Sequence, residues 1–126
     1  MVNTVTQYVV AVKDLEAAIK AYTALGFTFD RRARSESLGI DQAYFHMGDG
    51  SVIELAQPFD PKSAIGRGME RNGEGLYMLS LEVDDVAVAA QEMKDAGVQL
   101  IDAGDRVFVH PRSTHGILMR LDPKEG

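Results

Sequence analysis

Apolar and polar residues alternate along several short stretches of this chain, and a period of two is typical of strands with one buried face. The pattern predicts about eight strands, over residues 5–12, 27–32, 42–47, 51–57, 76–83, 98–102, 106–110 and 116–121. Residues 15–25 and 86–96 instead repeat their apolar positions every three or four residues, which predicts two main helices. Elements in this order indicate an α+β fold.

The chain contains the same segment twice. Residues 9–27 read as strand, Asp, Ala-rich helix, Gly and strand, and the same order returns 71 positions later. Asp14 and Asp85 directly precede the two helices, where an Asp side chain caps the first backbone amides. Gly26 and Gly97 follow the helices and suit a left-handed residue at each end.

A second correspondence links residues 52–58 with residues 118–123, since each is a strand that ends at a Pro. The sequence therefore predicts two tandem βαβββ modules that form a cupped, eight-stranded mixed sheet around a shared cleft. Equivalent strands direct equivalent residues into such a cleft. The four residues that the repeat matches in this way, and hence the candidate site, are Gln7 with Met78 and Glu54 with Arg120.

We expect one domain over residues 1–126, with module one at about 1–60 and module two at about 76–126. Residues 59–75 have no clear pattern and are expected to link the modules. A long segment of this kind also covers binding sites in compact domains, so a lid with a short helix at 65–69 is the alternative.

Composition narrows the possible functions. The 126 residues, 45% of them hydrophobic, suffice for one core. The absence of Cys excludes disulfides, a thiolate nucleophile and thiolate metal ligands. The net charge of −6 disfavours nucleic acid and anionic membrane surfaces as partners. Because no long apolar run and no secretory signal is present, the sequence predicts a soluble cytoplasmic protein.

Three separated segments have the form of known family motifs. Residues 7–15, Gln-Tyr-Val-Val-Ala-Val-Lys-Asp-Leu, are similar to His-Val-x-x-Ala-Val-x-Asp-Leu. Residues 73–85, Gly-Glu-Gly-Leu-Tyr-Met-Leu-Ser-Leu-Glu-Val-Asp-Asp, are similar to Gly-Glu-Gly-Leu-His-His-Ile-x-x-Glu-Val-Asp-Asp. Residues 110–121 match a closing hairpin that begins His-Pro-Lys-Ser. By these motifs the chain resembles the vicinal oxygen chelate superfamily, and within it the methylmalonyl-CoA epimerase and glyoxalase I branch.

The resemblance implies a divalent metal held by two His and two carboxylate or amide side chains. Those positions correspond to Gln7, Glu54, Met78 and Arg120, of which only Glu54 is a good ligand. The permanent charge of Arg120 repels a cation. We therefore expect no metal at the family site and no other cofactor. The resemblance also implies a homodimer.

Two interpretations of Glu54 and Arg120 remain open. In the first, their opposite charges pair across the cleft and only compensate for the lost metal. In the second, Arg120 binds a carboxylate or enolate oxygen of a substrate, and Glu54 is a general base. The second interpretation makes these two the predicted catalytic residues.

Further residues are candidates to contact a small-molecule ligand. They are Gln7, Tyr44, His46, Tyr77, Met78, Phe108 and His115. Structural alternatives exist for several of them. Gln7 alternatively hydrogen-bonds the Glu54–Arg120 pair, Met78 forms an apolar wall, and His46 lies at a solvent-exposed edge.

Two functions follow from these observations. The first is a metal-independent isomerase, epimerase or lyase that enolises a small acyl or keto compound, including CoA thioesters. The resemblance to epimerase segments motivates it. The alternative is a non-catalytic protein that binds a small molecule, as the antibiotic-sequestering members of the superfamily do. The change of three of the four ligand positions motivates this alternative.

Overall fold

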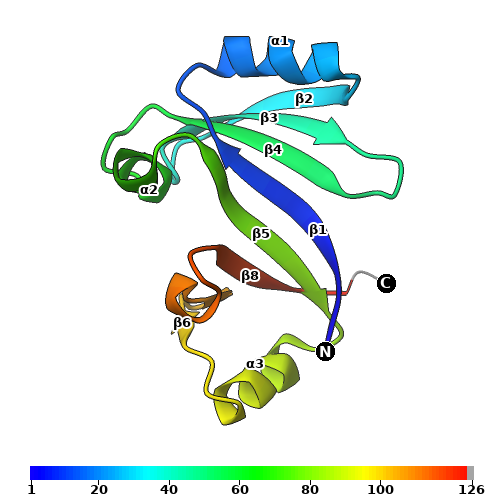
Figure 1. Cartoon of the computed structure of the whole chain (residues 1–126), viewed down its shortest axis with the longest axis vertical. Coiled ribbons are helices and arrows are strands. Elements are labelled where there is room, and N and C mark those ends of the chain that lie inside the picture. Colours follow the sequence, from blue (N-terminus) through cyan, green and yellow to red (C-terminus); the bar gives the residue numbers. More distant parts are fainter. Residues whose placement is uncertain (125–126) are drawn as a thin grey trace. The chain divides into compact units, whose positions relative to one another are not determined.

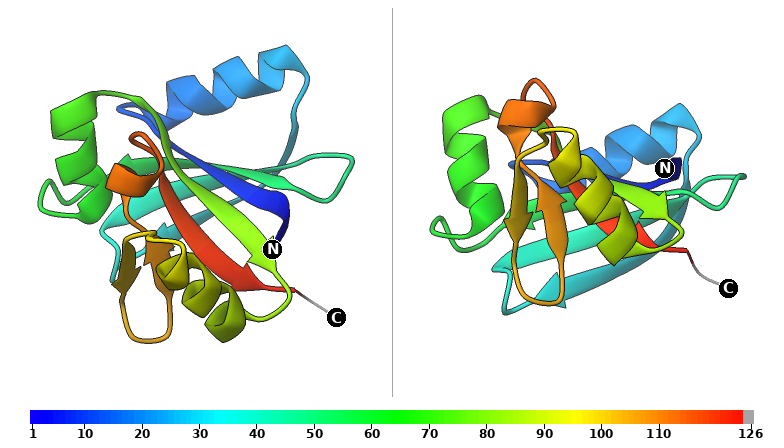
Figure 2. Two further views of the ribbon diagram at one scale, coloured as in Figure 1. Left: turned by 60° about the horizontal axis from the view of Figure 1, so that its bottom comes forward. Right: turned by 90° about the horizontal axis from the view of Figure 1, so that it is seen from below.

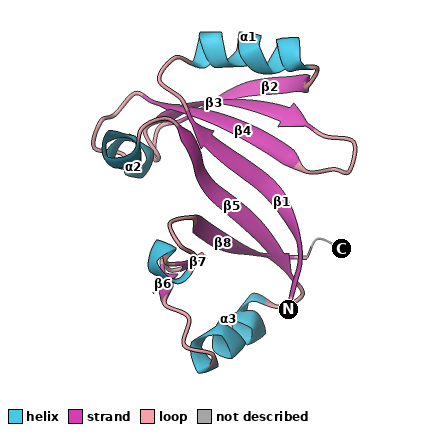
Figure 3. Ribbon diagram, in the orientation of Figure 1, coloured by secondary structure: helices cyan, strands magenta, loops and turns pink. Residues whose placement is uncertain are grey.

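The structure, a computed structural model, describes residues 1–124. Its strands are β1 (Val2–Ala11), β2 (Thr28–Ser35), β3 (Ile40–His46), β4 (Val52–Pro58), β5 (Gly75–Val83), β6 (Leu100–Asp102), β7 (Val107–Val109) and β8 (Leu118–Pro123). Its helices are α1 (Leu15–Leu25), α2 (Ala64–Asn72) and α3 (Val86–Asp95), with a 3₁₀ turn at Pro111–Ser113. The strands form one mixed sheet in the order β2-β3-β4-β1-β5-β8-β7-β6, which confirms the predicted α+β class (Figures 1 and 3).

The chain divides into two compact units. The first unit is Tyr8–Tyr77, and the second unit combines Met1–Gln7 with the chain from Met78 onward. Both divisions fall inside strands, β1 and β5, and the module limits at about residues 60 and 76 stay a prediction. Each unit is described separately below.

In the first unit, α1 covers one face of strands β2, β3 and β4, which pair antiparallel (Figure 1). Leu15, Ala18, Ile19 and Tyr22 of α1 pack against the core of this unit, as their helical spacing predicts. Phe45 of β3 is fully buried in the same core. Apolar side chains on this face therefore fix α1 to the strands.

The predicted helix caps are confirmed in both units. The Asp14 carboxylate accepts a hydrogen bond from the backbone N–H of Ala17 at 3.1 Å, and Asp85 accepts one from Val88 at 3.0 Å. Gly26 ends α1 in the left-handed region, with φ of 102°. These caps explain why α1 and α3 begin where the sequence predicted.

In the second unit, β5 pairs parallel with β8, and β8, β7 and β6 pair antiparallel (Figure 2). Ala89 and Ala90 of α3 are buried in the core of this unit, together with Leu81, Val83 and Leu121. The small side chains let the helix approach the sheet closely. The apolar spacing that predicts this helix therefore marks the face that it buries.

Helix α2 lies within the segment that has no clear sequence pattern, and it is longer than the helix considered there. The Ser63 hydroxyl caps it by accepting a hydrogen bond from the backbone N–H of Gly66 at 2.9 Å. Gly68 faces Tyr77 so closely that an added Cβ would lie 2.9 Å from Cε1 of the ring. None of the helices in residues 1–124 is long and apolar enough to span a membrane.

Candidate functional site

A polar cluster lies on β3 and β4 of the first unit. Successive side chains of a strand point to opposite faces. Phe45 and Leu55 belong to the core under α1, so Gln42, Tyr44 and Glu54 project from the other face. The register places Tyr44 directly opposite Glu54. Local alternation and strand pairing together bring these three side chains to one place.

Glu54 is a buried carboxylate, only 6% exposed. The amide of Gln42, 7% exposed, donates a hydrogen bond from Nε2 to Oε2 of Glu54 at 3.2 Å. Burial of a charged group is costly unless hydrogen bonds replace its hydration, and Gln42 supplies one such bond. Sequence reasoning missed Gln42, although a period of two places it on the same face as Tyr44.

The phenol of Tyr44 interacts with both Glu54 and Arg31. Its pKa is raised above the ordinary value, first by burial and next by the negative charge of Glu54, while Arg31 acts in the opposite direction. The Arg31 guanidinium lies 4.1 Å from the centroid of the Tyr44 ring, a cation–π contact. An ordinary phenol is already protonated at neutral pH and can donate a hydrogen bond, and the raised pKa extends this state to more alkaline pH.

A second polar cluster surrounds Arg120 on β8, in the second unit. Its Nε donates to both oxygens of Asp122, at 3.2 and 3.1 Å, and its Nη2 donates to the Ser80 hydroxyl at 2.9 Å. Arg106 also binds Asp122, at 2.8 Å. The Cα of Arg120 pairs with that of Phe108, so each closing strand sets its candidate catalytic residue opposite an aromatic residue.

The guanidinium of Arg120 is therefore fixed inside the second unit. Its side chain is 20% exposed, and planar bidentate contact with a carboxylate leaves little freedom of orientation. The pairing of Glu54 with Arg120 stays a prediction. Within its own unit Arg120 has a charged partner, Asp122, and Glu54 has a neutral hydrogen-bond donor, Gln42.

The remaining ligand candidates differ in their surroundings. Met78 is buried on β5, and Gln7 and Phe108 are half-buried. Tyr77 is half-buried against α2, and burial raises its pKa, with Arg71 and Arg67 acting in the opposite direction. Its contact with Gly68 gives the ring a structural role, in addition to the predicted ligand contact.

Two histidines named by the sequence are exposed. His46 ends β3, and its Nε2 lies 2.9 Å from Oδ2 of Asp30, so it is at a solvent-exposed edge. His115 lies in the loop before β8, with a left-handed φ of 59°. Their contact with a ligand stays a prediction.

The four positions of the family metal site do not fit a divalent metal. Met78 offers a thioether, which suits soft metals, and Arg120 carries a fixed positive charge that Asp122 and Ser80 hold in place. Within residues 1–124, no three His, Cys, Asp or Glu side chains form a metal-binding group. Only Glu54 and Gln7 have suitable oxygen donors, which is too few for a stable site.

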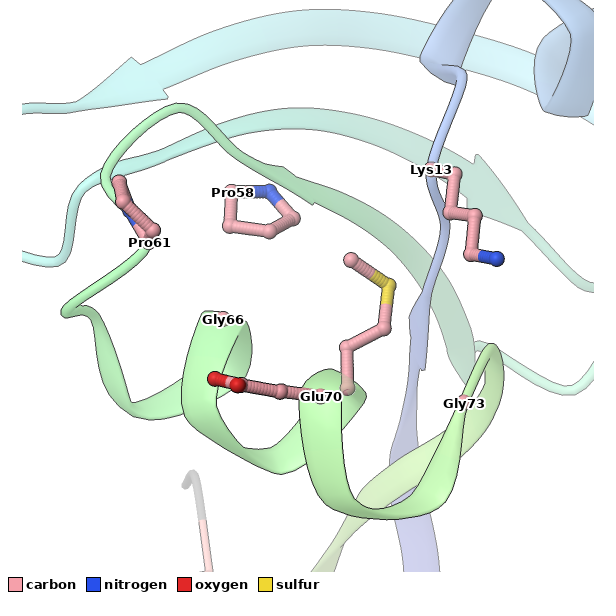
Figure 4. A pocket seen from close by; sticks show the side chains of 7 residues that line it. Lys13, Pro58, Pro61, Gly66, Glu70 and Gly73 are labelled. Atoms are coloured by element: carbon pink, nitrogen blue, oxygen red, sulfur yellow. The ribbon is translucent and has the colours of Figure 1, made fainter.

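A hollow of about 510 Å³ opens between α2 and the ends of β1 and β4 in the first unit (Figure 4). Its volume lies in the range of small-molecule sites. The residues that line it are Lys13, Pro58, Pro61, Gly66, Met69, Glu70 and Gly73. None of them was singled out as a site residue by the sequence.

Comparison with known proteins gives a consistent family. The sequence model of the glyoxalase/bleomycin resistance protein/dioxygenase superfamily matches residues 6–113. An ethylmalonyl-CoA/methylmalonyl-CoA epimerase from Cereibacter sphaeroides is 26% identical, over 97% of this chain and 98% of the relative. An uncharacterised protein of Bacillus subtilis is 29% identical, over 91% and 89%.

Solved structures give the same result. A variant of the methylmalonyl-CoA epimerase of Streptomyces coelicolor, in complex with 2-nitronate-propionyl-CoA, has a TM-score of 0.82 and 27% identity, with complete coverage of both chains. The methylmalonyl-CoA epimerase of Mycobacterium tuberculosis also has a TM-score of 0.82 and 27% identity, over 98% of this chain and 90% of that chain. The fold is therefore shared along nearly the whole chain.

Proposed function

Since the chain belongs to the glyoxalase/bleomycin resistance protein/dioxygenase superfamily, we propose that it is a metal-independent isomerase, epimerase or lyase that enolises an acyl-CoA thioester. Relatives and structural neighbours that are methylmalonyl-CoA epimerases support the substrate class. The poor fit of Met78 and Arg120 to a divalent cation supports chemistry by side chains alone.

The buried carboxylate of Glu54 carries this proposal. Gln42 donates to Oε2, and Tyr44 lies beside the carboxylate with its phenol protonated. A carboxylate in a buried, hydrogen-bonded position suits a general base, because its orientation is set before the substrate arrives.

In the proposed reaction, Glu54 accepts the proton from the carbon next to the thioester carbonyl. The C–H electron pair forms the carbon–carbon double bond of an enolate, and the carbonyl oxygen takes the negative charge. Arg120 donates hydrogen bonds to that oxygen, with its guanidinium held by Asp122 and Ser80. Contact of one substrate with both Glu54 and Arg120 is part of the proposal.

Exchange of the substrate proton with solvent tests the step directly. We expect protein dialysed against a chelator to incorporate deuterium into methylmalonyl-CoA or propionyl-CoA in heavy water, as followed by mass spectrometry. Glu54→Gln should slow the exchange by about 10²- to 10⁴-fold, and the exposed Glu92→Gln is the matched control. Unchanged exchange in Glu54→Gln, or exchange that returns only with added metal, contradicts the proposal.

A non-catalytic binding protein is the second candidate. The observation that favours it is the placement of Arg120, whose Nε and Nη2 already donate to Asp122 and Ser80 within the second unit. This alternative predicts calorimetric binding of an acyl thioester with no deuterium incorporation.

We also propose that the protein acts in the cytoplasm as a homodimer, supported by the family resemblance. Sedimentation equilibrium at the mass of one chain would contradict the dimer.

A further inference from the structure

The hollow beside α2 has walls that are held in place by hydrogen bonds. The backbone N–H of Lys13 donates to Oε1 of Glu74 at 2.7 Å, which ties the end of β1 to the segment after α2. The N–H of Leu15 donates to Oε1 of Gln57 at 2.7 Å, next to Pro58 on β4. Small-molecule sites are usually largely pre-formed, and this hollow meets that condition.

The hollow opens on the face of β4 that carries Glu54. Side chains alternate along a strand, so Glu54, Ala56 and Pro58 project from the same face. The separation of four residues at about 3.3 Å each gives roughly 13 Å between Glu54 and Pro58. A ligand with its reacting group at Glu54 reaches the hollow only if it carries a long, extended arm.

The charges in the hollow favour a neutral occupant. Lys13 contributes an ammonium group and Glu70 a carboxylate, while Pro58, Pro61 and Met69 contribute apolar surface (Figure 4). A phosphate group would be attracted by Lys13 and repelled by Glu70. A chain of secondary amides satisfies both groups, because its carbonyl accepts from the ammonium group and its N–H donates to the carboxylate.

We propose that this hollow binds the pantetheine arm of a coenzyme A thioester. The arm is long, uncharged, rich in amides and partly apolar, as these walls require. This inference rests on the proposed function for its substrate class, and it concerns a part of the molecule that does not react.

Filling the hollow tests the inference. We would measure the affinity of wild type and Met69→Trp by calorimetry for two probes, propionyl-CoA and the truncated thioester propionyl-N-acetylcysteamine. We expect Met69→Trp to weaken propionyl-CoA binding by about tenfold or more, while the affinity for the truncated thioester changes by less than about twofold. Val88→Trp, on the exposed face of α3, is the control.

A second, milder substitution keeps the test interpretable if Met69→Trp does not fold. Lys13 is exposed, so Lys13→Met should fold normally and weaken propionyl-CoA by roughly three- to tenfold, the value of one hydrogen bond. Unchanged affinity for propionyl-CoA in both variants, or equal losses for the two probes, overturns the inference. Arm-dependent binding without deuterium exchange would retain the inference and reject the proposed catalysis. Deuterium exchange together with equal losses of affinity for the two probes would retain the proposed catalysis and reject the inference.

Discussion

The contact between Gly68 and Tyr77 predicts a strong energetic coupling between α2 and β5. A Cβ at position 68 would lie 2.9 Å from Cε1 and 3.3 Å from Cδ1 of the ring. Carbon atoms in contact prefer about 3.5–4.0 Å, so the overlap reaches roughly 0.6 Å. Overpacking of this kind costs about 1–3 kcal/mol. Ala in place of Gly inside a helix gains about 1 kcal/mol, so Gly68→Ala should destabilise the protein by up to about 2 kcal/mol.

A double-mutant cycle separates the two contributions. Tyr77→Val removes the ring atoms that clash and keeps a residue suited to a strand. In that background we expect Gly68→Ala to stabilise the protein by about 1 kcal/mol, because only the helical preference remains. The measurement is urea unfolding followed by far-ultraviolet circular dichroism, with equal slopes in all four proteins. An equal effect of Gly68→Ala in both backgrounds would refute the packing argument.

Further predictions concern the two clusters and the helix caps. Asp122→Asn removes the carboxylate that holds two arginines and should cost about 1–3 kcal/mol of unfolding free energy in urea. In a phenolate absorbance titration, Glu54→Gln should lower the pKa of Tyr44, though burial keeps it raised. Because the raised pKa lets only the folded state retain this proton, stability should fall as pH rises above about 10, where an unfolded tyrosine ionises. Asp14→Ala and Asp85→Ala should each lower the unfolding free energy by about 1 kcal/mol, and no loss from either would contradict the capping role.

Short-range features of the fold were predictable from the sequence. Asp14 and Asp85 fix the helix starts through bonds to residues three positions ahead, and such local signals can be read directly along the chain. The period-two alternation likewise predicted the eight strands. Helix α2 was only an alternative, because its Gly66 and Gly68 weaken the helical pattern, and the packing of Gly68 on Tyr77 depends on tertiary contact.

The candidate site was only partly predictable, for a physical reason. Alternation places Glu54 on the correct face of β4, but its partner Gln42 lies on another strand, and strand register is not visible in the sequence. Asp122 is different, because it lies two residues after Arg120 on the same strand face. That spacing alone could have identified Asp122 as the partner of Arg120.

The polar cluster around Arg120 explains why a carboxylate at position 120 alone does not restore the family metal ligand. Asp122 carries a negative charge that Arg120 and Arg106 neutralise together. A carboxylate in place of Arg120 would lie beside Asp122, and two like charges at this distance disfavour joint ionisation. It would also leave the buried Ser80 hydroxyl without its donor. The positive charge at position 120 is therefore built into the local structure of β8, and chemistry at this site must be consistent with a fixed guanidinium.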